Sequence, residues 1–182
     1  VLPSEVGRVL EGADLQLVGV ARNQPSIPVA LMALNRYDTA NMTEHQIKSK
    51  AMRLKKKYGV KLFIIDYLQM MHSGTKTNSR EQEISNISRA LKGMAKSTKT
   101  PVIALSQLSR KCEERGDKRP MLSDLRDSGA IEQDADIVMF LYRDDYYNED
   151  TDKKNIAEVI IAKHRNGPTG TIELRWFGQY TK

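Results

Sequence analysis

The residue whose setting most clearly suggests chemistry is Asp66, a carboxylate that directly follows a run of large apolar side chains. The run is Leu62–Ile65, and it is too short for a helix and does not alternate. These features predict a central strand buried on both faces. Because a carboxylate is costly to bury, Asp66 is expected at the C-terminal edge of the strand, where open α/β sheets bind ligands. This is the pattern of a Walker-B strand, whose carboxylate holds a Mg²⁺-bound water beside a nucleoside triphosphate. The alternative is a core strand that ends in a turn Asp.

A second polar residue, Gln107, is expected to lie beside Asp66. After a polar loop, residues 79–97 combine a capping sequence with apolar residues at helical spacing, which predicts a helix. The apolar stretch 101–106 then predicts a strand that ends next to Gln107. Strand, helix and strand make a βαβ unit with a right-handed crossover and parallel strands. Topology therefore brings Asp66 and Gln107 to the same edge of one sheet.

Two cations, Lys163 and Arg165, stand where a further predicted strand, 157–163, runs into a turn rich in Gly and Pro. Side chains two residues apart on a strand project from the same face. No acidic residue lies between Lys163 and Gly170 to neutralise them locally. The simplest interpretation is an exposed basic end of a hairpin.

A long polar segment of mixed charge runs from Ser109 to Asp134. We expect a loop followed by short helical turns, with Ser123 as an N-cap. A loop of this length in a compact domain is usually functional or disordered. Because it leaves the same sheet edge as Gln107, it is well placed to reach a ligand or a polymer.

The remaining pattern completes an α/β fold. A capping box at 43–46 and a Gly at position 59 bound a helix whose outer face is basic, as a solvated surface commonly is. A third strand is predicted at 136–142, and residues 171–177 should pair antiparallel with strand 157–163 as a hairpin. We expect these strands to share one sheet with 61–66 and 101–106.

Composition sets outer limits on the function. The 182 residues suit one domain with a sizeable core, and 40% hydrophobic with 29% charged residues predict a soluble globular protein. No apolar run approaches a membrane span, and no signal peptide opens the sequence. The single cysteine, Cys112, excludes an intramolecular disulfide and indicates a reducing, cytoplasmic setting. A net charge of +6 and a pI near 9.4 favour an anionic partner such as nucleic acid.

One apparent phosphate-binding motif is rejected. Gly74–Thr77 looks like the tail of a P-loop, G-x-x-x-x-G-K-[ST], but position 69 is Gln and Thr precedes Lys76. The segment also follows the Asp66 strand instead of preceding it. None of the 11 glycines belongs to a complete P-loop.

Seven sequence blocks in order resemble one known family. They are Phe63–Gln69 (FIIDYLQ), Pro101–Arg110 (PVIALSQLSR), Lys118–Met121 (KRPM), Asp124–Gly129 (DLRDSG), Ile131–Asp136 (IEQDAD), Leu141–Tyr147 (LYRDDYY) and Ala162–Pro168 (AKHRNGP). Together they resemble the C-terminal motor domain of the replicative DNA helicases of the DnaB family. The resemblance covers residues 37–182, about four-fifths of the chain, and residues 1–36 are left as an unassigned lead-in.

The resemblance implies a RecA-like α/β fold: a mostly parallel twisted sheet flanked by helices, with a C-terminal antiparallel hairpin. It implies an ATP-dependent DNA helicase that forms a homo-hexameric ring, uses ATP with Mg²⁺ and moves along single-stranded DNA to unwind duplex DNA. Primase and a helicase loader are the further partners that it implies.

For the nucleotide, the resemblance implies roles for four residues. Asp66 matches the Walker-B carboxylate that serves the metal, and Gln107 matches the polar sensor of the γ-phosphate. Lys163 and Arg165 match the basic pair that reaches the nucleotide of a neighbouring subunit. His164 stands where Gln is common in the family, and strand alternation should point it away from its two neighbours.

For DNA, Arg126, Asp127 and Gly129 match the central-channel loop that holds the backbone of the strand. Glu is commoner than Asp at the position of Asp127. The alternative for Arg126 is a surface ion pair with Asp124 or Asp127. Gly129 would allow the backbone to approach the DNA closely.

Alternatives of different classes stay open. The family's P-loop and catalytic glutamate should lie upstream of the matched region, so the chain is either a fragment or a divergent member. The joint presence of Asp66, Gln107, Lys163 and Arg165, all matched to phosphate-facing positions, favours the motor hypothesis. A non-catalytic RecA-like module that binds DNA or forms rings is favoured by the missing P-loop. A RecA-like recombinase shares the fold but should not carry the signatures at both 66–69 and 163–167.

Overall fold

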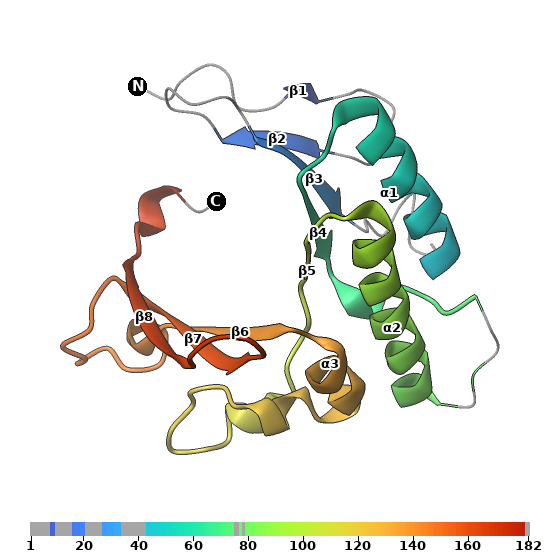
Figure 1. The fold of residues 1–182 in the computed structure, drawn as a ribbon. Coiled ribbons are helices and arrows are strands. Elements are labelled where there is room, and N and C mark those ends of the chain that lie inside the picture. Colours follow the sequence, from blue (N-terminus) through green and yellow to red (C-terminus); the bar gives the residue numbers. More distant parts are fainter. Residues whose placement is uncertain are drawn as a thin grey trace. The chain divides into compact units, whose positions relative to one another are not determined.

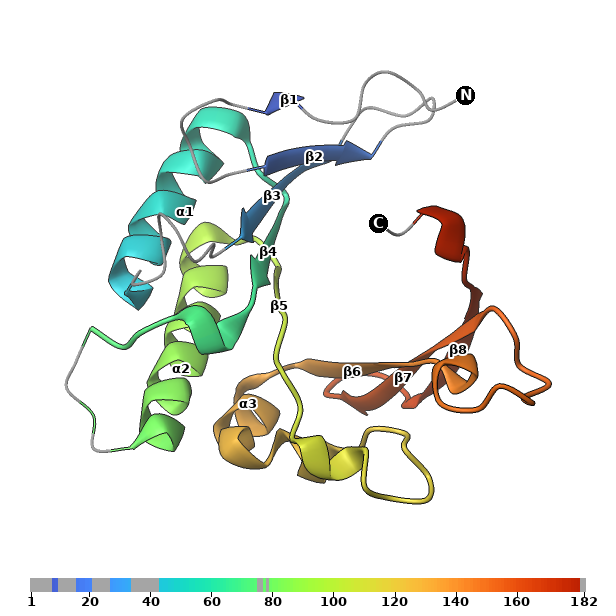
Figure 2. The ribbon, with the colours of Figure 1, turned by 180° about the vertical axis from the view of Figure 1, so that it is seen from behind.

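The computed structural model describes residues 8–9, 16–20, 27–33, 43–74, 77 and 79–180, with the backbone alone described at 8–9, 16–20, 27–33, 126–128 and 180. The lead-in predicted at 1–36 therefore lies largely outside the described residues. The chain divides into two compact units, Val1–Gln107 and Leu108–Lys182, which are drawn in Figures 1 and 2 and are described one at a time. None of the helices in the described ranges is long and apolar enough to cross a membrane.

The first unit is built on a five-stranded sheet in the order β1-β2-β3-β4-β5. Its strands are β1 (Arg8–Val9), β2 (Gln16–Val20), β3 (Ile27–Ala33), β4 (Leu62–Asp66) and β5 (Val102–Ala104). The pairs β1–β2 and β2–β3 are antiparallel, whereas β3–β4 and β4–β5 are parallel. The parallel pairing of β4 with β5, with a helix between them in sequence, confirms the predicted unit.

Two helices, α1 (Glu44–Tyr58) and α2 (Arg80–Thr98), lie side by side on one side of this sheet in both views (Figures 1 and 2). The predicted capping box of α1 is present: the Gln46 N–H donates to Thr43 Oγ1 at 3.4 Å, and the Thr43 N–H donates to Gln46 Oε1 at 2.9 Å. Gly59 ends α1 with a φ of 65°, a left-handed value that favours glycine. The N-cap of α2 is Ser79, whose hydroxyl accepts the Gln82 N–H at 3.2 Å.

The core of the first unit is formed by side chains of α1, α2, β4 and the residues around them. Its buried apolar members are Ile47, Ala51, Val60, Phe63, Ile65, Leu68, Met71, Ile84, Ile87, Leu91 and Met94. Strand β4 buries Phe63 and Ile65 completely but leaves Leu62 and Ile64 only half-buried. The predicted central position of β4 is confirmed, since it lies between β3 and β5. The predicted burial on both faces is complete on one face only, because α1 and α2 cover the same face of the sheet.

The second unit contains a three-stranded antiparallel sheet in the order β6-β7-β8. Its strands are β6 (Ile137–Tyr142), β7 (Ile156–His164) and β8 (Gly170–Arg175). Its short helices are η2 (Arg110–Cys112), η3 (Leu122–Ser128), α3 (Gly129–Asp134), η4 (Asp144–Tyr146) and η5 (Gly178–Tyr180). Strands β7 and β8 form the predicted hairpin, and η3 with α3 are the predicted helical turns. Met121, and not Ser123, is the N-cap of η3.

The prediction of one continuous sheet is wrong, because β6 and β7 hydrogen-bond in a sheet separate from that of β4 and β5. Strand β6 buries Val138, Phe140 and Tyr142 and exposes the residues between them. The buried side packs with Leu125 in a small core of its own. An all-apolar run does not reveal whether one or both of its faces are covered, so periodicity alone could not assign β6 to a sheet.

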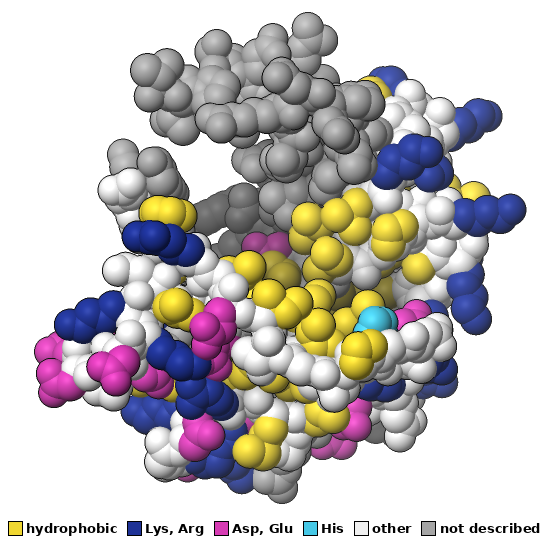
Figure 3. Space-filling model, turned by 60° about the vertical axis from the view of Figure 1, so that its left-hand side comes forward, with side chains coloured by type: hydrophobic (Ala, Val, Ile, Leu, Met, Phe, Trp, Pro, Cys, Tyr) yellow, Lys and Arg dark blue, Asp and Glu magenta, His cyan; other side chains and the backbone are white. Residues whose placement is uncertain are grey.

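Both units expose apolar side chains, which are among the hydrophobic side chains coloured yellow in Figure 3. In the second unit the exposed residues are Ile137, Met139 and Leu141 on β6 and Ile172 and Leu174 on β8. This alternation is the pattern of an antiparallel sheet with one covered face.

Candidate functional site

The structure brings Asp66 and Gln107 to the same edge of the first sheet. Asp66 is the last residue of β4, and Gln107 follows three residues after the end of β5. Both line one open pocket of about 350 Å³, together with Tyr67, Leu105 and Ser106. The juxtaposition predicted from topology alone is confirmed.

Backbone hydrogen bonds keep the two strand ends in register beyond the sheet. The Leu105 N–H donates to the Ile65 carbonyl, and the Leu68 N–H donates to the Leu105 carbonyl, each at 2.9 Å. The helical turn η1 (Leu68–Met70) starts at this point, so β4 ends in a short turn instead of an open loop. The pocket floor is therefore built from main chain as well as side chains.

Gln69 is a residue that sequence reasoning missed. Its Nε2 donates to Ser106 Oγ at 3.0 Å and to the Gln107 carbonyl at 3.4 Å, while its Oε1 accepts the Gln107 N–H at 3.2 Å. One amide side chain thus holds both Ser106 and Gln107, the second and third residues after β5. The sequence signal for this role was a Gln three positions after the Asp that ends the strand.

Arg80, at the start of α2, anchors the far side of η1. Its guanidinium donates to the carbonyls of Gln69 at 2.6 Å and Met71 at 3.4 Å, and it pairs with Glu83. Burial opposes ionisation of Glu83, but hydrogen bonds from the Ser73 N–H and from Arg80 outweigh it and leave the Glu83 pKa below its ordinary value.

Asp66 is exposed, and its carboxylate forms no hydrogen bond or ion pair with any residue in the described ranges. Mg²⁺ prefers oxygen ligands and usually keeps several of its bound waters. An unengaged carboxylate beside a hydroxyl and an amide fits a hydrated Mg²⁺. The described residues contain no group of three or more His, Cys, Asp or Glu that could form an all-protein metal cage. The donor set thus suits a metal that arrives with its own water and phosphate ligands.

Lys163, on β7, and Arg165, one residue past its end, reach the same carbonyl, as expected for side chains that project from one face. Lys163 Nζ donates to the Glu132 and Gln133 carbonyls, and Arg165 Nη2 donates to the Gln133 carbonyl at 3.1 Å. These carbonyls belong to the last turn of α3, where cations are favourable. His164 instead lies near the turn, with Nδ1 3.3 Å from the Pro168 carbonyl.

Asp136 adds a partner that a search along the local sequence could not find. Its carboxylate lies 3.1 Å from Arg165 Nε, although the two residues are 29 positions apart in the chain. The stretch from Lys163 to Gly170 contains no acidic residue, and the acidic partner of Arg165 comes from a different part of the chain. Both side chains are substantially exposed, so this ion pair is weak and readily exchanged for another anion.

The candidate DNA loop occupies η3 and the start of α3. The structure describes only the backbone at Arg126 and Asp127, both within η3. Gly129 has a right-handed helical backbone, and a Cβ added there would meet no atom within 4 Å. The fold itself does not require a glycine here.

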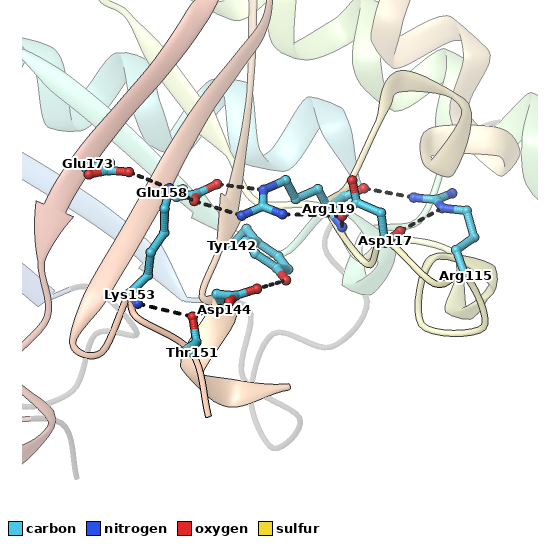
Figure 4. A network of polar contacts seen from close by, with 9 residues as sticks. All are labelled: Arg115, Asp117, Arg119, Tyr142, Asp144, Thr151, Lys153, Glu158 and Glu173. Carbon is cyan, nitrogen blue, oxygen red and sulfur yellow. Dashed lines mark hydrogen bonds and ion pairs between the residues drawn. The ribbon is translucent and has the colours of Figure 1, made fainter. Parts of the chain in front are cut away.

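The loop is tied down by an ion pair between Arg115 and Asp124 that sequence reasoning also missed, and Figure 4 shows the Arg115 side of it. Arg115 Nη1 and Nη2 donate to the two carboxylate oxygens of Asp124 at 2.7 and 2.8 Å. Both oxygens of Asp124 are thus engaged, and its side chain is buried. No short sequence pattern links residues nine positions apart in a loop.

A parallel βαβ unit with a carboxylate and an amide at the carboxyl edge defines an α/β domain with a ligand site at that edge of the sheet. The model of the DnaB-like helicase C terminal domain family matches residues 23–182, and the chain belongs to this family.

Relatives agree with this assignment. The chain is 56% identical over 146 residues to "Replicative DNA helicase DnaB" of Geobacillus stearothermophilus and to "Replicative DNA helicase DnaC" of Bacillus subtilis (strain 168), which covers 80% of this chain and 32% of each relative. The chain therefore spans about a third of the length of these curated relatives.

Solved structures show the same likeness. One is described as an "ATPase Domain", with a TM-score of 0.75 and 53% identity over 79% of this chain and 51% of that chain. Another is described as "The Structure Of A DnaB-Like Replicative Helicase And Its Interactions With Primase", with a TM-score of 0.73 and 54% identity over 78% of this chain and 34% of that one. The RecA-like fold predicted from the sequence is confirmed.

Proposed function

We propose that this chain is part of an ATP-driven replicative DNA helicase motor, which hydrolyses ATP with Mg²⁺ and moves along single-stranded DNA as a homo-hexameric ring in the cytoplasm. The observation that carries the proposal is the pairing of Asp66 with Gln107 at one sheet edge, in a chain of this family. Primase is a proposed partner because a similar structure is described with it. A helicase loader is a further proposed partner.

At the strand edge, Asp66 and Gln107 have different proposed roles. Mg²⁺, when bound, neutralises charge on the phosphates. The Asp66 carboxylate holds a water of that metal, as its freedom from other partners allows. The Gln107 side chain contacts the γ-phosphate and reports its loss, and Gln69 keeps Gln107 in place. Residues 1–182 contain no P-loop, so the reaction is tested in the full-length protein.

In the second unit, Lys163 and Arg165 are proposed to act on the nucleotide of a neighbouring subunit. Their shared face and the exposed position of Arg165 support this role. Arg165, with its planar fork, suits direct contact with the γ-phosphate, and Lys163 supplies further positive charge. The loop with Arg126, Asp127 and Gly129 is proposed to hold DNA phosphates, because a motor must track any sequence.

The test is the ATP hydrolysis rate of the full-length protein with single-stranded DNA, before and after Asp66→Asn. We expect the substitution to abolish hydrolysis, since an amide cannot replace the carboxylate at a metal-bound water. Asp150→Asn, a like change at an exposed loop residue, is the control and should keep the wild-type rate. Wild-type hydrolysis by Asp66→Asn would contradict the proposal. DNA binding without any hydrolysis by the wild-type protein would instead support a non-catalytic module.

A further inference from the structure

A network of charged side chains in the second unit runs from strands β7 and β8 to Arg115 (Figure 4), whose guanidinium binds Asp124 at the start of the candidate DNA loop. In order along the network, its members are Glu173, Lys153, Glu158, Arg119, Arg115 and Asp124. The middle of the network is the segment that carries Arg115 and Arg119. This segment contacts Glu158 of β7 through Arg119 and Asp124 of the loop through Arg115.

Arg119 fixes this segment to β7. Its Nε and Nη2 donate to the two carboxylate oxygens of Glu158 at 2.9 and 3.0 Å. Glu158 is only 3% exposed, and it also accepts from Lys153 Nζ at 2.9 Å. The guanidinium of Arg119 lies 4.6 Å from the centroid of the Tyr142 ring. A planar cation held by two oxygens and an aromatic face has one orientation, which a single surface ion pair does not enforce.

Arg115 connects the fixed Arg119 to the candidate DNA loop. Its Nη2 donates to the Arg119 carbonyl at 2.9 Å, and its guanidinium binds both oxygens of Asp124. Asp124 also accepts the Met121 N–H at 2.8 Å through its side chain and the Ser109 N–H at 3.0 Å through its carbonyl. Asp124 stands two residues before Arg126. The backbone that carries Arg126 is thus held immediately before it.

The same strand holds the other flank of the loop. Lys163 and Arg165, at the end of β7, donate to the carbonyls of Glu132 and Gln133 in the last turn of α3. Residues 122–134 are therefore tied to β7 before and after the proposed DNA contacts. Ties on both flanks reduce the conformations that the loop must give up when it binds.

We propose that Arg115 and Arg119 are positioning residues for DNA binding, which hold the loop around Arg126 on strand β7 without contacting DNA themselves. The inference rests on the proposed function, since it assumes that this loop holds DNA phosphates. Positioning and contact have different signatures. Loss of a contact removes a released counterion and lowers the salt dependence, whereas loss of positioning weakens binding at an unchanged number of contacts.

The experiment measures the Kd of the full-length protein for a fluorescently labelled oligo-dT strand over a series of salt concentrations, with a non-hydrolysable ATP analogue present. For Arg115→Ala we expect the Kd to rise about tenfold, with the slope of log Kd against log salt kept at its wild-type value. Arg119→Ala should do the same. Arg126→Ala should raise the Kd and reduce that slope by about 0.7 for each subunit whose Arg126 contacts the strand.

Arg143→Ala is the matched control, because Arg143 also pairs with a carboxylate, that of Asp145, but its described contacts do not reach the loop. It should leave both the Kd and the slope unchanged. Should Arg115→Ala fail to fold, Arg115→Lys takes its place, since it keeps the charge and loses the fork; the Kd should then rise about threefold at the same slope.

A wild-type Kd in the Arg115 variant would overturn the positioning role, as would a slope reduced as far as in Arg126→Ala, which would mean direct contact with phosphate. If Arg126→Ala itself has the wild-type Kd and slope, the assignment of the loop to DNA fails. That result would contradict the proposed function. A wild-type Kd for the Arg115 variant, together with a raised Kd for the Arg126 variant, would contradict only this inference.

Discussion

The strand edge of the first unit and the loop of the second unit are held in place by different forces. At the strand edge, the bonds that join the two strand ends come from the Gln69 amide and from backbone groups. The loop is held by guanidinium–carboxylate pairs, Arg115 with Asp124 and Arg119 with Glu158. The amide and backbone groups that link the strand ends do not titrate near neutral pH, whereas these links of the loop depend on ionised carboxylates.

This difference predicts how strongly salt and pH should affect each region. Neutral hydrogen bonds respond little to salt or to moderate changes in pH, so the Asp66–Gln107 geometry should persist across conditions. Ion pairs weaken when their carboxylates are protonated. The position of the proposed DNA loop should therefore be the acid-sensitive part. The predictions below test this contrast, beginning with the largest expected effect.

Phe63→Ala should have the largest effect on stability. Phe63 is fully buried beneath the strand edge, and removal of such a ring leaves a cavity that costs about 3–5 kcal/mol in the free energy of unfolding. Urea unfolding of the 182-residue chain, followed by far-UV circular dichroism, measures it. Met52→Ala, at a half-exposed position of α1, is the control and should change the free energy by less than about 0.5 kcal/mol. Equal effects would show that β4 is not a core strand.

Glu158→Gln should destabilise the second unit by about 2 kcal/mol at neutral pH, less than for a fully buried pair because Arg119 is 37% exposed. Hydrogen bonds from Arg119 lower the pKa of Glu158, and those from Arg115 lower the pKa of Asp124, below the ordinary 4.5 and 3.8. Because these pKa values are depressed in the folded state, the stabilisation is complete above the ordinary values. It is lost as the pH falls through the folded-state pKa values.

The fluorescence of Trp176, the single tryptophan of the sequence, follows this transition within the second unit. The wild type should lose stability as the pH falls below about 4.5, and Glu158→Gln should show a shallower loss over the same range. The same pH dependence in both proteins would show that the Glu158 pair does not stabilise the folded state.

Gln69→Ala should cost about 1–2 kcal/mol, because it removes hydrogen bonds to Ser106 and Gln107 that are partly exposed. In the full-length protein the substitution should lower the kcat for ATP hydrolysis with little change in KM, since Gln107 is displaced and not removed. Gln82→Ala, a solvent-exposed Gln of α2, is the control. A strong dependence of the Gln69→Ala effect on pH would break the contrast between the two regions.

Thr43→Ala should have the smallest effect, about 0.5–1 kcal/mol, because it deletes the capping hydroxyl of an exposed helix end. Thr43→Ser keeps the hydroxyl and should be near wild type. Thermal unfolding followed by circular dichroism distinguishes the two. A loss in Thr43→Ser equal to that in Thr43→Ala would mean that the methyl group, and not the cap, matters.

The sequence predicts what local pattern and topology determine. Asp66 and Gln107 meet because parallel strands end at one edge, and the α1 cap forms because Thr43 and Gln46 are adjacent on the first turn. The division into two sheets could not be predicted, because the apolar run of β6 fits a strand covered on one face as well as a strand covered on both. Arg119 with Glu158 and Arg165 with Asp136 are pairs of residues distant in sequence, which only the folded chain brings together.

The measurement that tests the proposed function most directly is ATP hydrolysis by mixed rings of the full-length protein. Arg165→Ala alone should bind nucleotide but lose about 10³–10⁵ of the hydrolysis rate, as expected for removal of a finger that acts in trans. Asp66→Asn alone should also be inactive. Mixed with Arg165→Ala, it should restore hydrolysis, since some interfaces then join an intact Asp66 to an intact Arg165 of the neighbouring subunit. Wild-type hydrolysis by Arg165→Ala, or mixed rings that stay inactive at every ratio, would contradict a site completed by two subunits.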